Sequence, residues 1–149
     1  MDKREIMTHL RAAKAAHIKW RAYAQAIVAG FSIEQDHVPV IHTNCKFGQW
    51  YYGNGQILSS LGTYSAIDTP HAMLHQTYMK IFKLLFGEVT HSMFSKMFGS
   101  KAKLQAKNQA EAEKLMEQLI SISETLLEAI QMLEREVIDM SDEELQQLY

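Results

Sequence analysis

Four side chains in this sequence are of types that together bind a metal ion. They are the single cysteine and three histidines placed on both sides of it, namely His17, Cys45, His71 and His75. A thiolate and three imidazoles are a ligand set that Zn²⁺ accepts tetrahedrally, at roughly 2.3 Å to sulfur and about 2.0–2.1 Å to nitrogen. Because there is no second cysteine, Cys45 cannot form an intramolecular disulfide, which leaves packing, metal binding or thiol chemistry.

Each of these residues also has an ordinary structural interpretation. A single inward-facing histidine is commonly held by a hydrogen bond, and a lone cysteine commonly packs as a small apolar side chain. Histidines one helical turn apart also occur on exposed helices. The spacings from His17 to Cys45 and from Cys45 to His71 are too long for a zinc finger or ribbon. From the residues alone, a zinc site and a metal-free core both remain open.

The first of these residues falls within a predicted helix over residues 2–29. Apolar or small side chains recur there at helical spacing, and His17 occupies the missing position of that stripe. Asp2 is placed to cap the start of the helix, and Gly30 is placed to end it. His17 is therefore expected to point toward whatever this helix packs against.

Cys45 is expected at the start of a short helix that follows a loop over residues 31–43. Thr43 or Asn44 is the expected N-cap. A cysteine in the first turn lies near unpaired backbone N–H groups and the positive end of the helix dipole, which favours its thiolate. Gly48 is expected to permit a close approach to the metal. Residues 47–66 are expected to form a short helix and a loop rather than a strand, since no partner strand is available.

The last two histidines fall within a helix that is predicted to begin at Asp68-Thr69-Pro70 and to end near Gly87. His71 and His75 are four residues apart, so they share one helical face and both rings can reach one ion. Asp68 is either a helix cap or a hydrogen-bond acceptor for the outer nitrogen of a ligand histidine.

The remaining sequence predicts further helices. Residues 88–107 form a Met- and Phe-rich segment that is expected to add a helix to the core, and a helix of roughly 30 residues follows from Asn108. Ser141 begins a new capping signal with Glu144. The predicted fold is all-α, an antiparallel four-helix bundle with an extra short helical segment around 88–107, in a single domain over 1–149.

Composition limits the partners. The chain has 149 residues, a formal net charge of −2 and a pI near 6.4, which gives no broad electrostatic reason to bind nucleic acid or an anionic membrane. No apolar run approaches the roughly 18 residues of a membrane span, and the N-terminus does not resemble a signal peptide. With a lone thiol, a reducing cytoplasmic location is expected.

A family resemblance is carried by three runs of residues. They are His17-Ile18-Lys19-Trp20, Cys45-Lys46-Phe47-Gly48-Gln49-Trp50-Tyr51-Tyr52 and His71-Ala72-Met73-Leu74-His75. In this order they resemble the chemoreceptor zinc-binding domain (CZB) family, whose pattern is a histidine and a nearby tryptophan, a Cys-x-hydrophobic-Gly-x-Trp segment and a His-x-x-x-His pair. The resemblance covers residues 5–85 well. It implies a bacterial, cytosolic helical bundle in which His17, Cys45, His71 and His75 bind zinc.

The resemblance also implies a function. Family members are usually attached to a chemoreceptor or to a cyclic-di-GMP synthase, and zinc occupancy or cysteine oxidation changes their output. We therefore expect a stand-alone zinc-binding sensory module, not an enzyme, because four protein ligands leave no position for a substrate. It would respond to zinc availability or thiol oxidation and signal through a homodimer or a chemoreceptor or diguanylate cyclase partner, in chemotaxis or cyclic-di-GMP pathways.

Two alternatives come from other classes of protein. One is a zinc-dependent metalloenzyme in which one of the four ligands is exchangeable. The other is a metal-free helical adaptor whose last helix pairs with a partner. Four further histidines are expected to be non-ligands: His9, His37, His42 and His91. Among them His42 is the first alternative ligand, because it lies only three residues before Cys45.

Overall fold

The structure, a computed structural model, describes residues 1–31, 42–86 and 100–149, with the side chains of residues 100–102 excluded. All its regular elements are helical, in agreement with the predicted all-α class. The helices are α1 (Lys3–Val28), α2 (Lys46–Tyr51), the 3-10 helix η2 (Asn54–Leu58), α3 (Gly62–Ser65), α4 (Asp68–Phe86), α6 (Ser100–Asp139) and α7 (Asp142–Gln146).

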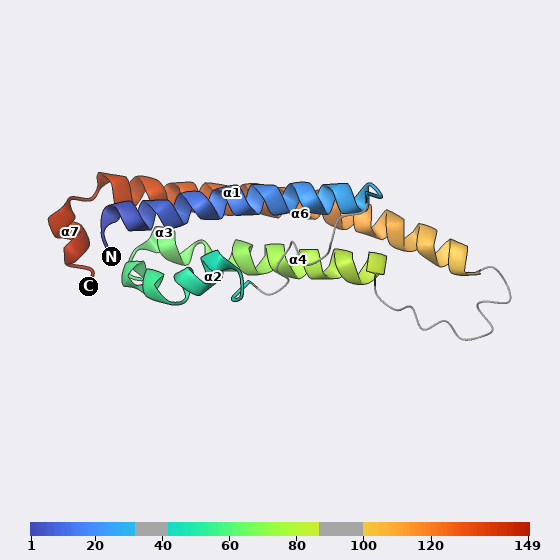
Figure 1. Cartoon of the computed structure of the whole chain (residues 1–149), viewed down its shortest axis with the longest axis horizontal. Helices are drawn as coiled ribbons and strands as arrows, with labels where there is room; N and C mark the ends of the chain where they lie inside the picture. Colours follow the sequence, from blue (N-terminus) through green and yellow to red (C-terminus); the bar gives the residue numbers. More distant parts are fainter. Residues whose placement is uncertain (32–41, 87–99) are drawn as a thin grey trace.

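The long helices α1, α4 and α6 lie side by side and form most of the bundle (Figure 1). Helices α1 and α4 run in the same direction, while α6 runs opposite to both and packs against both. Between α1 and α4 the chain returns through the short helices α2 and η2. The fourth member of the predicted antiparallel bundle is therefore a set of short helices, and the site described below lies where α2 meets α1 and α4.

Helix α1 begins and ends at the residues that its sequence predicts. The Asp2 carboxylate accepts a hydrogen bond from the backbone N–H of Glu5, and the Glu5 carboxylate accepts one from the backbone N–H of Asp2. This reciprocal pair is a capping box. After the C-cap residue Ala29, Gly30 adopts a φ of 97°, a left-handed conformation that glycine adopts without strain. His17, in the buried stripe of this helix, is fully buried.

Helices α4 and α6 differ in how closely they follow the prediction. Helix α4 spans Asp68–Phe86, within a residue of the expected bounds. Helix α6 has 40 residues and begins at Ser100, eight residues before the expected start at Asn108. Residues 100–107 thus belong to α6 rather than to an extra segment, because they contain strong helix formers and no helix-breaking residue. The rest of the predicted segment, 88–99, lies outside the described residues.

The short elements complete the bundle. Ser141 is the N-cap of α7 and forms the predicted capping box with Glu144. Residues 47–66 are helical or turns, as expected. Most of the expected loop over residues 31–43 lies outside the described residues, whereas residues 42–44 form a turn before α2. None of the described helices has the length and apolar character of a membrane span.

The buried face of α6 provides the largest continuous part of the core. Its predicted apolar stripe is buried at Leu119, Leu126, Ile130, Leu133 and Val137. Since α6 packs against both α1 and α4, this stripe holds the two helices that carry the histidines at a fixed separation. The histidines are therefore positioned by core packing and not by a local loop.

Candidate metal centre

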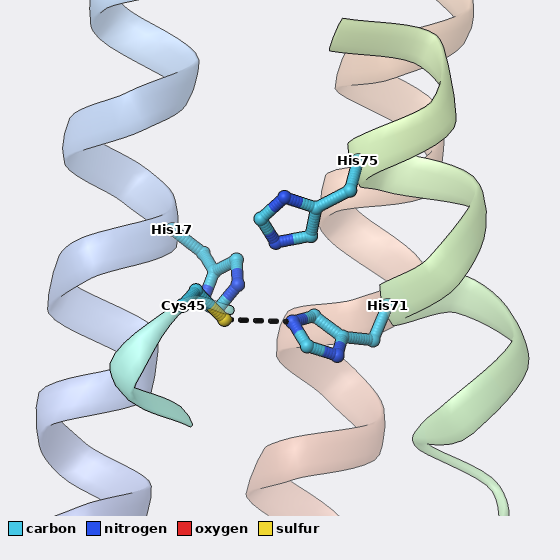
Figure 2. A group of neighbouring side chains, drawn as sticks. All are labelled: His17, Cys45, His71 and His75. Carbon is cyan, nitrogen blue, oxygen red and sulfur yellow. Dashed lines mark hydrogen bonds between the residues drawn. The ribbon is translucent and has the colours of Figure 1, made fainter. Parts of the chain in front are cut away.

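The fold brings the four sequence-predicted residues together in the interior of the bundle. We refer to them as the His3Cys cluster: His17, Cys45, His71 and His75. One potential ligand atom from each residue can be chosen so that all four atoms lie within 4.8 Å of one another. Each residue is 0–1% exposed. Figure 2 shows the side chains converging from α1, from the start of α2 and from α4.

His17 is held in one orientation by its own helix. Its Nδ1 lies 2.7 Å from the backbone carbonyl oxygen of Ala13. Because a carbonyl only accepts, Nδ1 carries the proton and the lone pair is on Nε2. Among the described residues, this buried Nε2 has no hydrogen-bond partner. A buried polar atom without a partner costs roughly 1–3 kcal/mol, and a metal ion is a partner for such a nitrogen.

Burial also keeps His17 in the form that binds metal. Desolvation lowers its pKa to about 4, although the hydrogen bond to Ala13 acts in the opposite direction. Neutral imidazole is the metal-binding form of histidine. The environment of His17 therefore reduces competition from protons at neutral and mildly acidic pH.

Cys45 occupies a slightly different position from the one predicted. It is itself the N-cap of α2, and its sulfur accepts a hydrogen bond from the backbone N–H of Gly48 at 3.2 Å. The thiol also donates to the carbonyl of His42 at 3.3 Å. The expected N-cap at Thr43 or Asn44 is therefore wrong by one or two residues, because the side chain of Cys45 caps the helix in their place.

The charge state of Cys45 also differs from the expectation. Burial raises the pKa of the thiol, and it outweighs the hydrogen bonds from the Gly48 and Phe47 backbone, which act to lower the pKa. The prediction that helix position alone favours the thiolate is therefore wrong. A neighbouring positive charge is needed to stabilise the thiolate here, and a zinc ion would supply one.

His71 and His75 lie one turn apart on α4 and both face the cluster, with ring centroids 4.9 Å apart. Nε2 of His71 lies 3.4 Å from Sγ of Cys45. Two ligand atoms on one tetrahedral zinc are about 3.3–3.8 Å apart, so this separation already fits a shared ion. Burial lowers the pKa of His71 to about 2, and the neighbouring histidines His17, His75 and His42 add to this effect.

Asp68 does not hold His71 in the way the sequence allowed. Its carboxylate accepts a hydrogen bond from the hydroxyl of Tyr52, and it is the first residue of α4. Nδ1 of His71 is buried and has no hydrogen-bond partner among the described residues. The predicted bond from a ligand histidine to Asp68 is therefore absent for His71.

Aromatic side chains surround the cluster. Phe47 packs edge-on against His17 and His71, with ring centroids 5.9 and 5.1 Å away. Trp20 packs edge-on against His17, with ring centroids 4.7 Å apart. Trp50 is buried and packs on Phe47 at 5.9 Å, one residue removed from the cluster. This apolar surround limits water access, which strengthens interactions between a metal and its ligands.

Comparison with known proteins agrees with this geometry. Residues 17–82 match the family model described as the chemoreceptor zinc-binding domain. The matched range contains every member of the His3Cys cluster. Residues 17–82 belong to the chemoreceptor zinc-binding domain family. No curated protein and no solved structure matches the chain in these comparisons.

The chemoreceptor zinc-binding domain of this chain thus has a donor set suited to its expected cofactor, Zn²⁺. Three imidazoles and one sulfur are ligands that zinc prefers, and their burial matches a structural site with a complete set of protein ligands. The donors come from three separate elements, α1, the cap of α2 and α4. Metal binding would therefore connect parts of the domain that are distant in sequence.

One side of the chemoreceptor zinc-binding domain gives access to the cluster. A groove of about 950 Å³ between α1 and α2 is lined by Cys45 and by apolar side chains that include Ala16, Trp20 and Trp50. None of the three cluster histidines lines this groove. Small molecules from solvent would therefore meet the sulfur before the imidazoles.

The other described histidines of the domain have different surroundings. His9 is exposed and stacks on Trp50, with ring centroids 4.9 Å apart. His42 is half-buried, and its ring centroid lies 5.6 Å from that of His71. His37 and His91 lie outside the described residues. Of the two described histidines outside the cluster, His42 is the one that lies beside a cluster histidine. Its ring nitrogens are not among the four ligand atoms that lie within 4.8 Å of one another.

Proposed function

We propose that His17, Cys45, His71 and His75 bind one Zn²⁺ through three imidazole nitrogens and the Cys45 sulfur. The observation that carries this proposal is the convergence of four buried donor atoms within 4.8 Å. The unpartnered Nε2 of His17 supports it, since this atom is turned into the cluster by the hydrogen bond from Nδ1 to Ala13.

We propose a regulatory rather than a catalytic role. Four protein ligands complete a tetrahedral shell, whereas catalytic zinc sites retain an open position for water or substrate. Aromatic rings also border the histidines, since Phe47 packs edge-on against His17 and His71 and Trp20 packs edge-on against His17. The zinc ion would thus connect α1, the start of α2 and α4, and it would stabilise the Cys45 thiolate.

Zinc availability is one signal that such a site would report. The ligands lie on α1, at the start of α2 and on α4, and their binding free energy would contribute to holding these elements together. Helices α1 and α4 meet directly at few points and are connected through α6. Loss of the ion would therefore loosen α2 and the turn before it, because the long helices keep their contacts with α6.

Thiol oxidation is the second signal. Cys45 lines the groove between α1 and α2, where hypochlorous acid or a peroxide would reach the sulfur. A two-electron oxidation of the thiolate to a sulfenate reduces the oxidant and weakens the bond to zinc. In this proposal both signals act on one element, the cap of α2.

We further propose that the chain acts as one domain over residues 1–149 and signals through a homodimer or a chemoreceptor or diguanylate cyclase partner, in the cytoplasm of a bacterium. The family of residues 17–82 supports a sensory assignment. The formal net charge of −2 supports a protein partner over nucleic acid or an anionic membrane.

The test is the metal content of protein purified without added metal. We would compare the unmodified chain with Cys45→Ala and His75→Ala, and use His9→Ala as the control because His9 stacks on Trp50 outside the cluster. We expect about one zinc per chain in the unmodified protein and the control, and a large loss in both cluster variants. Absence of zinc even after reconstitution would leave a metal-free helical adaptor, and an undiminished zinc content in either purified cluster variant would indicate an exchangeable ligand.

A further inference from the structure

A fifth metal-binding side chain lies at the edge of the His3Cys cluster. The ring centroid of His42 is 5.6 Å from that of His71. The ring separations among the three cluster histidines are 4.9, 5.1 and 5.8 Å, so the His42 ring lies at a distance typical of this group. His42 is therefore a neighbour of the site even though its nitrogens do not converge with the other donors.

The backbone of His42 is fixed directly against Cys45. The carbonyl oxygen of His42 accepts a hydrogen bond from the Cys45 thiol at 3.3 Å. The same oxygen lies only 1.8 Å from where a Cβ would be on Gly48, so this close packing requires glycine at that position. The close approach at Gly48 is thus with the turn at His42, whereas the sequence led us to expect it with the metal. His42 and Cys45 consequently belong to one closely packed turn that precedes α2.

His42 differs from the cluster residues in its exposure. The four cluster residues are buried, whereas His42 is half-buried, and its ring also packs against Tyr52 at 5.5 Å. One edge of its environment faces solvent and the other faces His71. A buried site with a complete set of ligands exchanges its ion only if one ligand leaves or a further ligand joins, and zinc tolerates such five-coordinate states.

We propose that His42 is an auxiliary zinc ligand that takes the place of Cys45 while the ion enters or leaves the site, or when the thiolate is lost. Imidazole is a ligand that zinc accepts readily. Cys45 is the residue replaced because it shares a turn with His42, so the exchange needs movement of that turn alone. The rigid positions of His17 on α1 and of the histidine pair on α4 are unchanged by it. This inference rests on the proposed zinc-binding function.

The experiment compares metal binding by the full chain and its variants, with Zn²⁺ or Co²⁺ alone as the probe. The variants are Cys45→Ala, Cys45→Ala/His42→Ala and Cys45→Ala/His9→Ala. Substitution of His42 by alanine removes the ring but keeps the carbonyl that contacts Cys45. Dissociation constants come from competition with a chelator, Co²⁺ absorption reports tetrahedral coordination, and circular dichroism checks that each variant is helical.

We expect Cys45→Ala to retain weakened binding with a tetrahedral Co²⁺ spectrum that lacks the sulfur charge-transfer band. Removing His42 as well should weaken binding on the order of a further tenfold, the lower end of the effect seen when supporting groups of metal sites are lost. Removing His9 should have no such effect. In the otherwise unmodified chain, His42→Ala should slow the transfer of zinc to excess chelator severalfold.

Three results would overturn the inference. Cys45→Ala could bind no metal, or its affinity could be the same with and without His42, or the His9 control could lose as much affinity as the His42 variant. In each of these cases the unmodified chain still binds zinc and the proposed function stands. If the unmodified chain binds no zinc, the proposed function fails and this inference fails with it.

Discussion

The Nδ1–H of His17 donates a hydrogen bond to the carbonyl oxygen of Ala13, one helical turn earlier, at a distance of 2.7 Å. This bond selects one tautomer and one ring orientation, so Nε2 faces the cluster before any ion arrives. Fixing a ligand in advance reduces the conformational entropy lost on binding. His17 is therefore held in position for metal binding by a bond within its own helix.

Removal of zinc should lower the thermal stability of the chain. At free zinc one hundred times its dissociation constant, binding stabilises a folded protein by about 2.7 kcal/mol, which corresponds to a Tm change of roughly 5–10 °C in a domain of this size. The measurement is a thermal melt with and without chelator. Cys45→Ala and His75→Ala should show a much smaller chelator effect, and a Tm unaffected by chelator in the unmodified protein would contradict the zinc assignment.

The metal-free protein should lose stability as the pH falls from about 6.5 toward 4. Burial lowers the pKa of His17 to about 4 and of His71 to about 2, whereas the unfolded chain binds these protons near pH 6.5. In that interval the unfolded state binds more protons, so the free energy of unfolding falls by about 1–3 kcal/mol per pH unit.

Urea unfolding in chelator at pH 7, 6 and 5 measures this slope. The matched variant is His17→Gln, which removes one buried titrating group and should reduce the slope by about 1.4 kcal/mol per pH unit. Equal slopes in the two proteins would show that His17 is protonated at the same pH in the folded and unfolded states.

Gly48→Ala should disrupt the turn that positions Cys45. The added Cβ would lie 1.8 Å from the carbonyl oxygen of His42. This oxygen is a backbone atom, so it cannot move aside as the end of a flexible side chain could. We expect a loss of roughly 1–3 kcal/mol in the free energy of unfolding together with weaker zinc binding, since the backbone must shift. Denaturant unfolding and chelator competition measure the two effects.

Gly62→Ala is the control for this substitution. No atom of the described residues lies within 4 Å of a Cβ at Gly62, which is in α3, so alanine there should change stability by less than about 1 kcal/mol and leave zinc affinity unchanged. Similar effects of the two substitutions would mean that the contact between Gly48 and His42 does not position the sulfur.

Oxidation of Cys45 should release zinc. Cys45 borders the groove between α1 and α2, and a sulfenate is a poorer zinc ligand than a thiolate. Zinc release after hypochlorous acid is measured with a chromogenic chelator, and mass spectrometry locates the modified residue. This localisation is needed because the exposed methionines Met73 and Met132 compete for oxidant. Zinc retained in protein that is oxidised at Cys45 would exclude the redox signal, whereas rebinding after reduction would support it.

The sequence predicted the features that depend on local pattern. The stripe of α1 placed His17 inward, the spacing of His71 and His75 placed them on one face, and capping signals located the starts of α1 and α7. These predictions are confirmed because helix periodicity and helix caps involve residues at most a few positions apart.

The remaining features depend on contacts between distant residues. The pKa of Cys45 is decided by burial under other helices, which outweighs the local amide hydrogen bonds that the sequence indicated. The Asp68 carboxylate accepts a hydrogen bond from the hydroxyl of Tyr52, which lies sixteen residues earlier in the sequence. No spacing rule predicts this bond. The proximity of His42 to His71 likewise arises only when the turn before α2 packs beside α4.

Helix α6 is much longer than the helices against which it packs. At about 1.5 Å per residue its 40 residues extend about 60 Å, compared with about 40 Å for the 26 residues of α1. The end of α6 that begins at Ser100 projects beyond α1 and α4 (Figure 1). This projecting end therefore offers a partner protein a part of α6 that α1 and α4 do not cover.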